Sequence, residues 1–336
     1  MQRMDGLNLE INNQPRQEAS KQLRRPRLAL LCPLIACALL LTMVNTALAV
    51  EAADFDPDPA LAHAYHLSEE IGDRPGGSLG EQAAAGWLAG HFAALGYEVR
   101  VQPFPFYRRG VPLVGMNVIA TRAGLPDYGV LYAGAHYDTV ERIPGFAYGG
   151  PGANDNASGV GVLLEVARLY ASAPLTPTLT LIAFGAEEEG LVGSRYFVNH
   201  LPIGAQFLAE GMINLDCVGI GEELHLYYHR AEDQTFAERL PVAPDRIDWL
   251  RSGSSDHAAF ADADIPALLF SMHPETGTCG PHYHKPTDTF ATLERLAIER
   301  TGQAAVNALR YLMENATPRS VKVYYLPLIG MAPRGN

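Results

Sequence analysis

Short apolar runs of strand length alternate along this chain with longer stretches of helical spacing. The runs apolar enough to form largely buried strands are residues 99–106, 116–121, 128–135, 179–184, 212–215, 224–228 and 267–271. Between several of them, apolar positions recur every three or four residues, which predicts helices over residues 68–95, 159–170 and 292–314. The prolines in the first strand-like run favour an edge position for it, because proline cannot donate to a ladder of strand hydrogen bonds.

This alternation of strands and helices predicts the fold class. It is typical of an α/β domain, here a three-layer αβα sandwich with a mixed, mostly parallel central sheet. In the first helix, the inward face is expected to hold Ala83, Trp87, Leu88 and Phe92. Ligands of such sheets bind at the carboxyl ends of the strands, so the residues directly after the strand-like runs are the first candidates for chemistry.

Three consecutive carboxylates follow the strand-like run of residues 179–184. They are Glu187, Glu188 and Glu189, and packing alone gives no reason to place three mutually repelling groups there. A divalent cation would explain them, since one carboxylate can bind metal while a neighbour takes a proton from metal-bound water. The simpler interpretation is a solvated helix start, where the helix dipole favours acidic side chains.

Other candidate ligands also follow strand-like runs. His136 and Asp138 come directly after residues 128–135, Asp155 lies before the helix of residues 159–170, and Asp216 follows residues 212–215. Each has a structural alternative: His136 as a buried histidine with its hydrogen bonds satisfied, Asp155 as a helix cap and Asp216 as a turn residue. Asp138 could orient the imidazole of His136.

Near the C-terminus, His282 and His284 point the same way in an extended segment, so either could be a ligand. With one of them, the ligand order is His, Asp, Glu, Asp, His, a set that suits zinc, cobalt or manganese. Five ligands exceed what one open tetrahedral zinc needs. A bridging carboxylate would let them hold two metals with room for a shared water.

The order of these motifs is HxD, GAxDNxSG, EExGLxGS, NLD and YHxPxDT. It resembles the family 28 metallopeptidases, the aminopeptidase Y type of dinuclear zinc exopeptidase. The likeness extends upstream to residues 72–78 and 95–99, and the matching region runs from residue 58 to residue 315. Carried over residue by residue, it implies that His136 and Asp216 hold one metal, Glu188 and His284 hold the other, and Asp155 bridges the two.

The resemblance also implies an activity. Glu187 would be the general base that accepts a proton from a metal-bridging water and passes it to the departing amine. The cofactors would be two divalent metal ions, with Zn²⁺ favoured, and the substrates peptides with a free N-terminus. The family further implies a cis peptide between Asp155 and Asn156. Asp256 and His257 resemble another recurrent family segment, which we interpret as pocket lining or support.

Two other functions remain as alternatives. One is a glutaminyl cyclase, which shares this fold but resembles a one-zinc site. The other is a catalytically inactive binding ectodomain on the same scaffold. The full set of ligands disfavours both. A metal titration giving one equivalent, together with cyclisation of N-terminal glutamine, would favour the cyclase.

Charge and cysteine content narrow the context. The net charge of −12 makes nucleic acid an unfavourable partner, because phosphate binding needs a basic face. Cys217 and Cys279 could form a disulfide in an oxidising compartment, but the sequence does not set their distance.

The ends of the chain suggest three regions. Residues 1–49 combine a basic stretch, an apolar stretch and a small-x-small site, which predicts a signal peptide and an exported protein. The alternative is an uncleaved signal anchor that would hold the protein at a membrane by residues 28–50. Residues 50–318 would form the zinc peptidase catalytic domain, and residues 319–336 a C-terminal tail. Side-chain preference and oligomeric state stay open.

Overall fold

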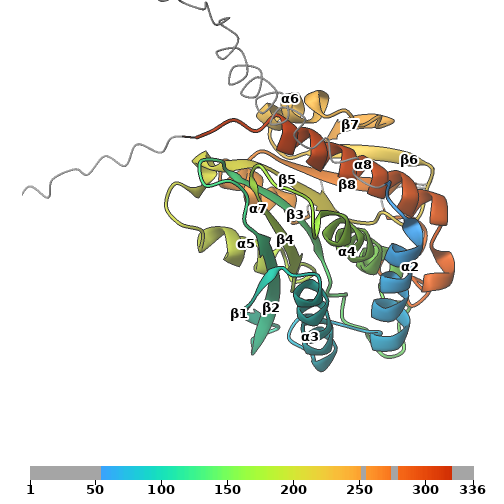
Figure 1. The fold of residues 1–336 in the computed structure, drawn as a ribbon. Helices are drawn as coiled ribbons and strands as arrows, with labels where there is room; N and C mark the ends of the chain where they lie inside the picture. Colours follow the sequence, from blue (N-terminus) through green and yellow to red (C-terminus); the bar gives the residue numbers. More distant parts are fainter. Residues whose placement is uncertain (1–53, 251–254, 274–278, 320–336) are drawn as a thin grey trace, which may run out of the picture. The chain divides into compact units, whose positions relative to one another are not determined.

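The computed structural model describes residues 54–250, 255–273 and 279–319 (Figure 1). Within these ranges, no helix is both long enough and apolar enough to cross a membrane. The expected signal peptide or anchor lies outside the described residues, as does all but the first residue of the expected C-terminal tail.

The central sheet has eight strands in the order β1-β2-β4-β3-β5-β8-β6-β7. Strand β3 pairs in parallel with β4 and β5, β5 with β8, and β6 with β7, whereas the remaining neighbours are antiparallel. The prediction of a mixed, mostly parallel sheet is therefore confirmed, and β1 lies at an edge as its prolines indicated. The bounds are β1 Glu98–Arg108, β2 Val111–Arg122, β3 Val130–His136, β4 Thr178–Phe184, β5 Ala209–Leu215, β6 Glu223–Tyr228, β7 Arg246–Trp249 and β8 Ala267–His273.

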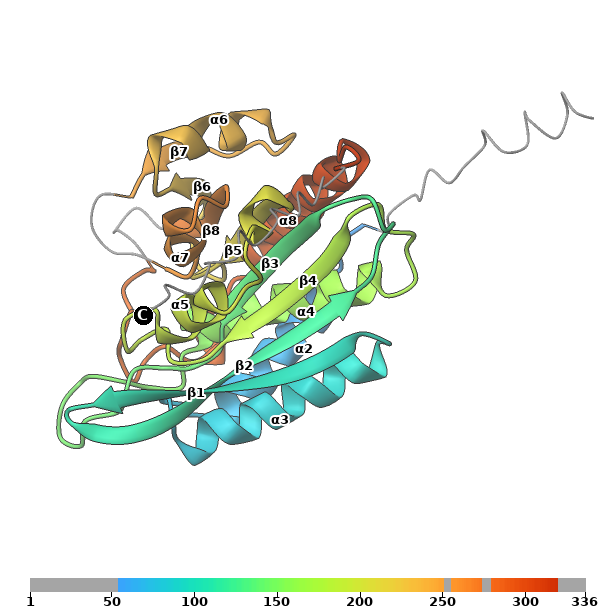
Figure 2. The same cartoon turned by 90° about the vertical axis from the view of Figure 1, so that its left-hand side faces the viewer.

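Helices cover both faces of this sheet (Figure 2). One face carries α2, α3, α4 and α8, and the other carries α5 and α7, while α6 packs near β6 and β7. The bounds are α2 Pro57–Tyr65, α3 Leu79–Ala94, α4 Ser158–Tyr170, α5 Val192–Asn199, α6 Ala231–Arg239, α7 His257–Asp262 and α8 Arg295–Glu314. The result is the expected three-layer arrangement.

Two separate cores follow from the alternation of side chains along the strands. In β3, Leu131 and Ala133 pack in the core under α2, α3, α4 and α8, whereas Tyr132 packs in the core under α5 and α7. Neighbouring residues of a strand point to opposite faces, so a strand buried on both sides reads as a continuous apolar run. This explains why the strand-like runs were visible without alternation in the sequence.

The expected helix over residues 68–95 is wrong in its first part. A π-helical turn spans His66–Ile71, and α3 begins only at Leu79, after a loop rich in glycine and proline. Ser78 caps the helix by accepting a hydrogen bond from the amide of Glu81. Of the expected inward face, Leu88 and Phe92 are buried and Trp87 is half-buried, whereas Ala83 is exposed and Ala84 and Ala85 are buried in its place.

Candidate metal centre

The ends of three neighbouring strands bring most of the candidate ligands together. His136 is the last residue of β3, Asp216 follows the end of β5, and Glu187 and Glu188 lie in the turn after β4. Because β3 pairs in parallel with both β4 and β5, the carboxyl ends of the three strands lie at one edge of the sheet. Asp155 comes from the segment that leads into α4.

The side chains form two clusters that share Asp155. In one cluster, Nε2 of His136 lies 3.1 Å from Oδ1 of Asp155 and 3.4 Å from Oδ1 of Asp216. In the other, Nε2 of His284 lies 3.3 Å from Oδ2 of Asp155 and 3.1 Å from Oε2 of Glu188. The two oxygens of one carboxylate thus face two different histidines, the arrangement expected of a bridging ligand.

The spacing of these atoms fits metal ions. Tetrahedral zinc with bonds of about 2.0–2.2 Å holds neighbouring ligand atoms roughly 3.3–3.6 Å apart. Oε1 of Glu188, Oδ1 of Asp216 and Nε2 of His284 are also buried without a hydrogen-bond partner among the described residues. Buried polar atoms without partners cost free energy, and a bound cation would satisfy these. The donor set therefore fits two divalent cations.

The pKa values of the carboxylates also favour bound cations. Burial raises the pKa of Glu187 well above its usual range. Burial, followed by repulsion from Asp155, raises the pKa of Glu188 to about 8. Burial also acts to raise the pKa of Asp155, but its interactions with His136 and His284 outweigh burial and lower that pKa. Cations would offset the repulsion that resists full ionisation of these carboxylates.

Asp138 does more than the sequence predicted. Its backbone carbonyl oxygen lies 3.3 Å from Nδ1 of His136, whereas its carboxylate is 3.6 Å from that atom, beyond hydrogen-bond range. The carboxylate instead accepts the backbone amides of Glu187 and Glu188, at 3.0 and 3.2 Å. Asp138 therefore holds the turn that carries both glutamates, in addition to contacting the histidine through its main chain.

The Asp155 segment is fixed from several sides. The carboxylate of Asp288 accepts the backbone amides of Asn154 and Asp155, at 2.8 and 3.1 Å. The side chain of Asn156 donates to the carbonyl of Leu215, next to Asp216. The peptide bond between Asp155 and Asn156 is cis, as the family resemblance implied.

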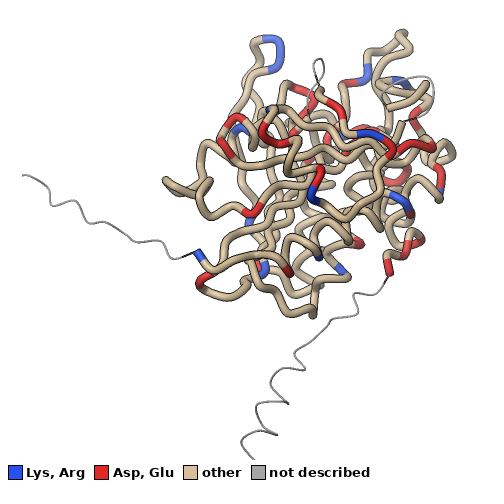
Figure 3. Tube along the Cα trace, turned by 90° about the horizontal axis from the view of Figure 1, so that it is seen from above, with Lys and Arg blue, Asp and Glu red and all other residues tan. Residues whose placement is uncertain are grey.

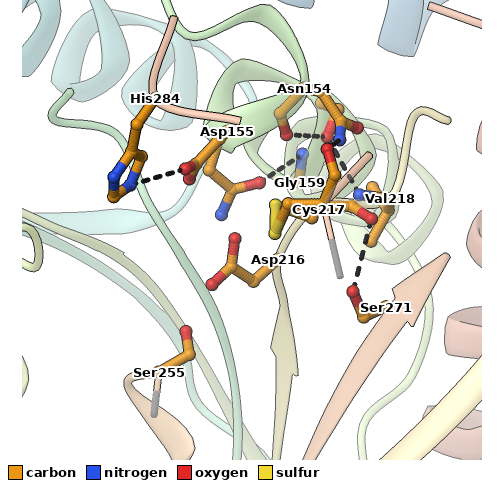
Figure 4. The surroundings of a disulfide bond; sticks show 12 residues. Asn154, Asp155, Gly159, Asp216, Cys217, Val218, Ser255, Ser271 and His284 are labelled. Carbon is orange, nitrogen blue, oxygen red and sulfur yellow. Dashed lines mark hydrogen bonds and ion pairs between the residues drawn. A yellow bond between two sulfur atoms is a disulfide. The ribbon is translucent and has the colours of Figure 1, made fainter. Parts of the chain in front are cut away.

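Two further contacts join loops around the centre. Cys217, next to Asp216, forms a disulfide with Cys279, which answers the question that the sequence left open (Figure 4). The second contact is made by Arg74, which is fully buried. Its guanidinium donates at 2.6–3.2 Å to five backbone carbonyls, those of Leu67, Gly72, Tyr137, Pro151 and Gly152.

The clusters open into a cavity of about 440 Å³. Metal-centre residues line one part of it, and side chains from β6 and β8 line another. The lining includes Tyr227, Leu250, Leu269, Ser271 and His273, none of which was predicted to belong to the site. Their sequence signal was weak: His225 and Tyr227 alternate along a strand-like run, as polar positions do on the exposed face of a strand.

The structure places the remaining candidates as follows. His282 is half-buried, and its Nδ1 lies 2.9 Å from the hydroxyl of Thr287, outside both clusters. Asp256 and His257 are fully buried behind the cavity and do not line it, so support rather than lining describes them. Basic residues are scattered among acidic ones along the chain in Figure 3. The exclusion of nucleic acid stays a prediction.

Comparison with known proteins gives a consistent picture. The model of peptidase family M28 matches residues 117–309. Aminopeptidase YwaD of Bacillus subtilis is 34% identical over 210 residues, covering 59% of this chain and 44% of YwaD. Leupeptin-inactivating enzyme 1 of Streptomyces exfoliatus is 32% identical over 316 residues, covering 84% of this chain and 70% of that enzyme. The matched region thus spans less than half of YwaD and 70% of the Streptomyces enzyme.

Solved structures share the fold. BSAP, a zinc aminopeptidase from Bacillus subtilis, matches with a TM-score of 0.66 at 23% identity, covering 76% of this chain and 95% of its own. A Porphyromonas gingivalis glutaminyl cyclase matches with a TM-score of 0.63 at 23% identity, covering 77% of this chain and 99% of its own. At this identity the likeness shows the fold alone, and it does not separate the two activities.

Proposed function

This chain belongs to peptidase family M28, and on that premise we propose that it is a zinc-dependent aminopeptidase acting on peptides with a free N-terminus. Residues 50–318 would form its catalytic domain. The observation that carries the proposal is the shared carboxylate of Asp155, whose two oxygens lie 3.1 and 3.3 Å from the Nε2 atoms of His136 and His284. The names of the relatives, an aminopeptidase among them, support the same activity.

Five side chains would hold two zinc ions. His136 and Asp216 would bind one ion, Glu188 and His284 the other, and Asp155 both. When bound, the ions supply Lewis acidity to the scissile carbonyl and to a water molecule. The protein's own contribution is to hold the five ligands in place before binding, through the strand ends and the hydrogen bonds beneath them.

Glu187 is suited to move the proton. It lines the cavity, and its carboxylate belongs to the same group of candidate donor atoms as His136 and Glu188. Its backbone amide is fixed by Asp138. We assign Glu187 as the base that accepts a proton from the attacking water and then donates it to the leaving amine. A single carboxyl can do both because the two transfers follow one another.

The glutaminyl cyclase alternative would use one zinc ion. The cluster of His136 and Asp216 speaks against the cyclase, because these two residues would bind no metal in a one-zinc site. The oxygen of Asp216 that faces His136 is buried without a hydrogen-bond partner in the described part of the chain, as expected of a metal ligand. An inactive binding ectodomain is disfavoured because all five candidate ligands are present and gathered around one carboxylate.

The test combines metal content with activity. Purified protein dialysed against zinc is expected to retain two ions per chain by mass spectrometry of the metal. It should release fluorophore from aminoacyl amides and lose that activity with a chelator. N-acetylated amides serve as the control and should not be cleaved, because their amino group is blocked. One zinc per chain with cyclisation of N-terminal glutamine would instead establish the cyclase.

We also propose that the protein is exported. The disulfide between Cys217 and Cys279 supports this, because disulfides persist in oxidising compartments. The mass of the mature protein tests the route: cleavage after Ala49 indicates a signal peptide. The full-length mass in the membrane fraction would favour an anchor, and the full-length protein in the cytosol would refute export.

A further inference from the structure

One wall of the cavity is polar and separate from the proposed metal ligands. It is built on β6 and β8, which pair so that Tyr227 lies opposite Leu269 and His225 lies opposite Ser271. Tyr227, Leu269, Ser271 and His273 all line the cavity. Alternate residues of a strand share a face, so His225 belongs to the same surface as Tyr227.

Hydrogen bonds link this wall into a chain. Nε2 of His225 lies 3.1 Å from a carboxylate oxygen of Glu223. The hydroxyl of Tyr227 lies 3.1 Å from Nδ1 of His225 and 2.9 Å from Nε2 of His273. The two imidazole rings are stacked, with their centroids 4.3 Å apart. Tyr227 is therefore held between two histidines, one of which is anchored on a carboxylate.

The direction of each hydrogen bond follows from the chemistry of the groups. An ionised carboxylate only accepts, so Nε2 of His225 carries its proton toward Glu223. With a single proton on His225, held at Nε2, Nδ1 presents a lone pair, and Tyr227 donates its one hydroxyl proton there. The oxygen of Tyr227 must accept from Nε2 of His273, which leaves Nδ1 of His273 as an acceptor. Burial lowers the pKa of His273 to about 4, so the ring is neutral at pH 7.

The rest of the pocket is consistent with an accepting wall. The hydroxyl of Ser271 donates to the carbonyl of Cys217 at 3.4 Å, and its oxygen is left to accept. Leu191, Leu250 and Leu269 line the same cavity and offer contact to the methylene groups of a substrate side chain. The pocket therefore combines an apolar passage with acceptors.

The charged groups beside the wall are mainly carboxylates, which also favour a hydrogen-bond donor in the cavity. Asp248 lies 3.5 Å from Nδ1 of His225, and Glu223 lies 3.1 Å from Nε2. Arg246, at 3.7 Å from Glu223, offsets one of these two carboxylates. The net negative charge disfavours an acidic substrate side chain and favours one that donates hydrogen bonds.

We propose that this wall, made of His225, Tyr227, Ser271 and His273, selects peptides whose N-terminal residue ends in an N–H donor (glutamine, asparagine, lysine or arginine) over apolar residues of the same size. The inference rests on the proposed aminopeptidase function and names its substrate class. A competing cation lines the same cavity: Arg195 is exposed and has no ion-pair partner among the described residues. It would favour acidic side chains, so glutamate substrates separate the two.

Three fluorogenic amides of nearly equal size test the proposal: those of glutamine, methionine and glutamate. For the zinc-loaded wild type, kcat/KM for glutamine should exceed that for methionine about three- to tenfold, the effect of one added hydrogen bond, with glutamate lowest. His273→Leu removes the acceptor and should bring the glutamine-to-methionine ratio close to one. Tyr227→Phe removes only the hydroxyl that orients His273 and should lower the ratio part of the way.

His91→Leu is the matched control, because this histidine lies on α3 and does not line the cavity. It should keep the wild-type ratio. A wild-type ratio of one or below, a preference for glutamate, or an unchanged ratio in His273→Leu would overturn the proposal.

Binding separates a failure of this inference from a failure of the proposed function. Calorimetry of zinc-loaded Glu187→Gln with glutamine amide and methionine amide should show tighter binding of the glutamine compound, and His273→Leu in that background should remove the difference. If no amide is hydrolysed by the wild type, the aminopeptidase assignment fails, and the calorimetry still decides the side-chain preference. Equal affinities would refute it.

Discussion

Buried polar groups differ between the two sides of the loops that surround the candidate metal centre. Beneath the loops, each nitrogen of the Arg74 guanidinium donates to at least one backbone carbonyl. On the cavity side, polar atoms of Glu188, Asp216 and His284 are buried without a hydrogen-bond partner among the described residues. The two sides lie close together in the sequence, since Tyr137, whose carbonyl accepts from Arg74, directly follows the proposed ligand His136.

This contrast distinguishes buried polar groups that stabilise the fold from those that are placed to bind a ligand. A buried polar group that is fully paired stabilises one arrangement of the chain. A cluster of buried groups left without partners costs stability and indicates a missing ligand. The underside therefore fixes the loops, and the cavity side is left to bind.

The largest expected effect comes from removing the residue shared by both clusters. Asp155→Ala should lose zinc from both positions and lower kcat/KM by at least about a thousandfold, because several kcal/mol of charge stabilisation depend on the ions. The rise in melting temperature that zinc gives the wild type should also disappear. Asp155→Asn, which keeps the shape but not the charge, is the matched variant and should bind zinc weakly. Wild-type zinc content in Asp155→Ala would refute the bridging role.

Glu187→Gln tests whether a buried carboxylate at the cavity can act in proton transfer without holding metal. Turnover should fall about 10²- to 10⁴-fold, the usual contribution of a general base. Zinc content should stay at the wild-type level, since Glu187 is not among the five proposed ligands. Near-normal turnover with full zinc loading would exclude the base assignment.

Arg74→Met tests how much the hydrogen bonds beneath the loops stabilise the fold. Five backbone carbonyls would lose a charged donor in a buried site, so the free energy of unfolding should fall by about 3 kcal/mol or more. Urea denaturation of the chelator-treated protein measures this without a contribution from zinc. Arg142→Met is the control: its ion pair with Asp73 is half exposed and should contribute less than about 1 kcal/mol. Equal losses in the two variants would contradict a special role for Arg74.

The last effect concerns a buried acceptor that lies away from the cavity. One oxygen of Glu81 accepts the amide of Gly77, and the other has no hydrogen-bond partner among the described residues. Burial, followed by repulsion from Asp138, raises the pKa of Glu81 from 4.5 to about 8. Here a proton, and not a metal ion, resolves the unpaired charge.

The sign of the pH effect follows from this shift. Between pH 4.5 and 8, the unfolded chain releases the proton of Glu81 while the folded chain keeps it, so stability falls as the pH rises. Glu81→Gln should therefore gain stability relative to the wild type from pH 5 to pH 8 in urea denaturation of metal-free protein. Glu98→Gln, at an exposed glutamate, should show no such trend. A difference that stays constant with pH would refute the raised pKa.

Much of the fold was predictable because buried parallel strands leave a local signal. The runs that became β3, β4, β5 and β8 are apolar on both sides, and α4 follows its predicted range within one residue. The start of α3 was predicted too early because residues 68–71 were joined to it, although residues 72–78 carry no apolar helical spacing. There, glycines and a proline interrupt the helix, and the cap at Ser78 sets the real start.

The candidate site was partly predictable for a different reason. Residues at the ends of parallel strands share an edge whatever the details of packing, so His136, Asp155, Glu187 and Asp216 could be grouped from the sequence. The stacking of His225 on His273 was hidden, because β6 and β8 are far apart in the chain and their antiparallel register is set by pairing in three dimensions. The role of Arg74 could not be predicted from its place in the motif of residues 72–78, because nothing local reveals which carbonyls a guanidinium will reach.

The sequence by itself determined the order of the layers, the acidic and histidine groups at the strand ends, and the family to which they point. These depend on local patterns: apolar runs, helical spacing and short motifs. Only the tertiary structure decided that Asp155 faces two histidines, that Asp138 holds the glutamate turn, that Cys217 bonds to Cys279 and that an accepting wall lines the cavity. Each of these depends on distances between segments far apart in the chain, which strand pairing and loop packing fix together.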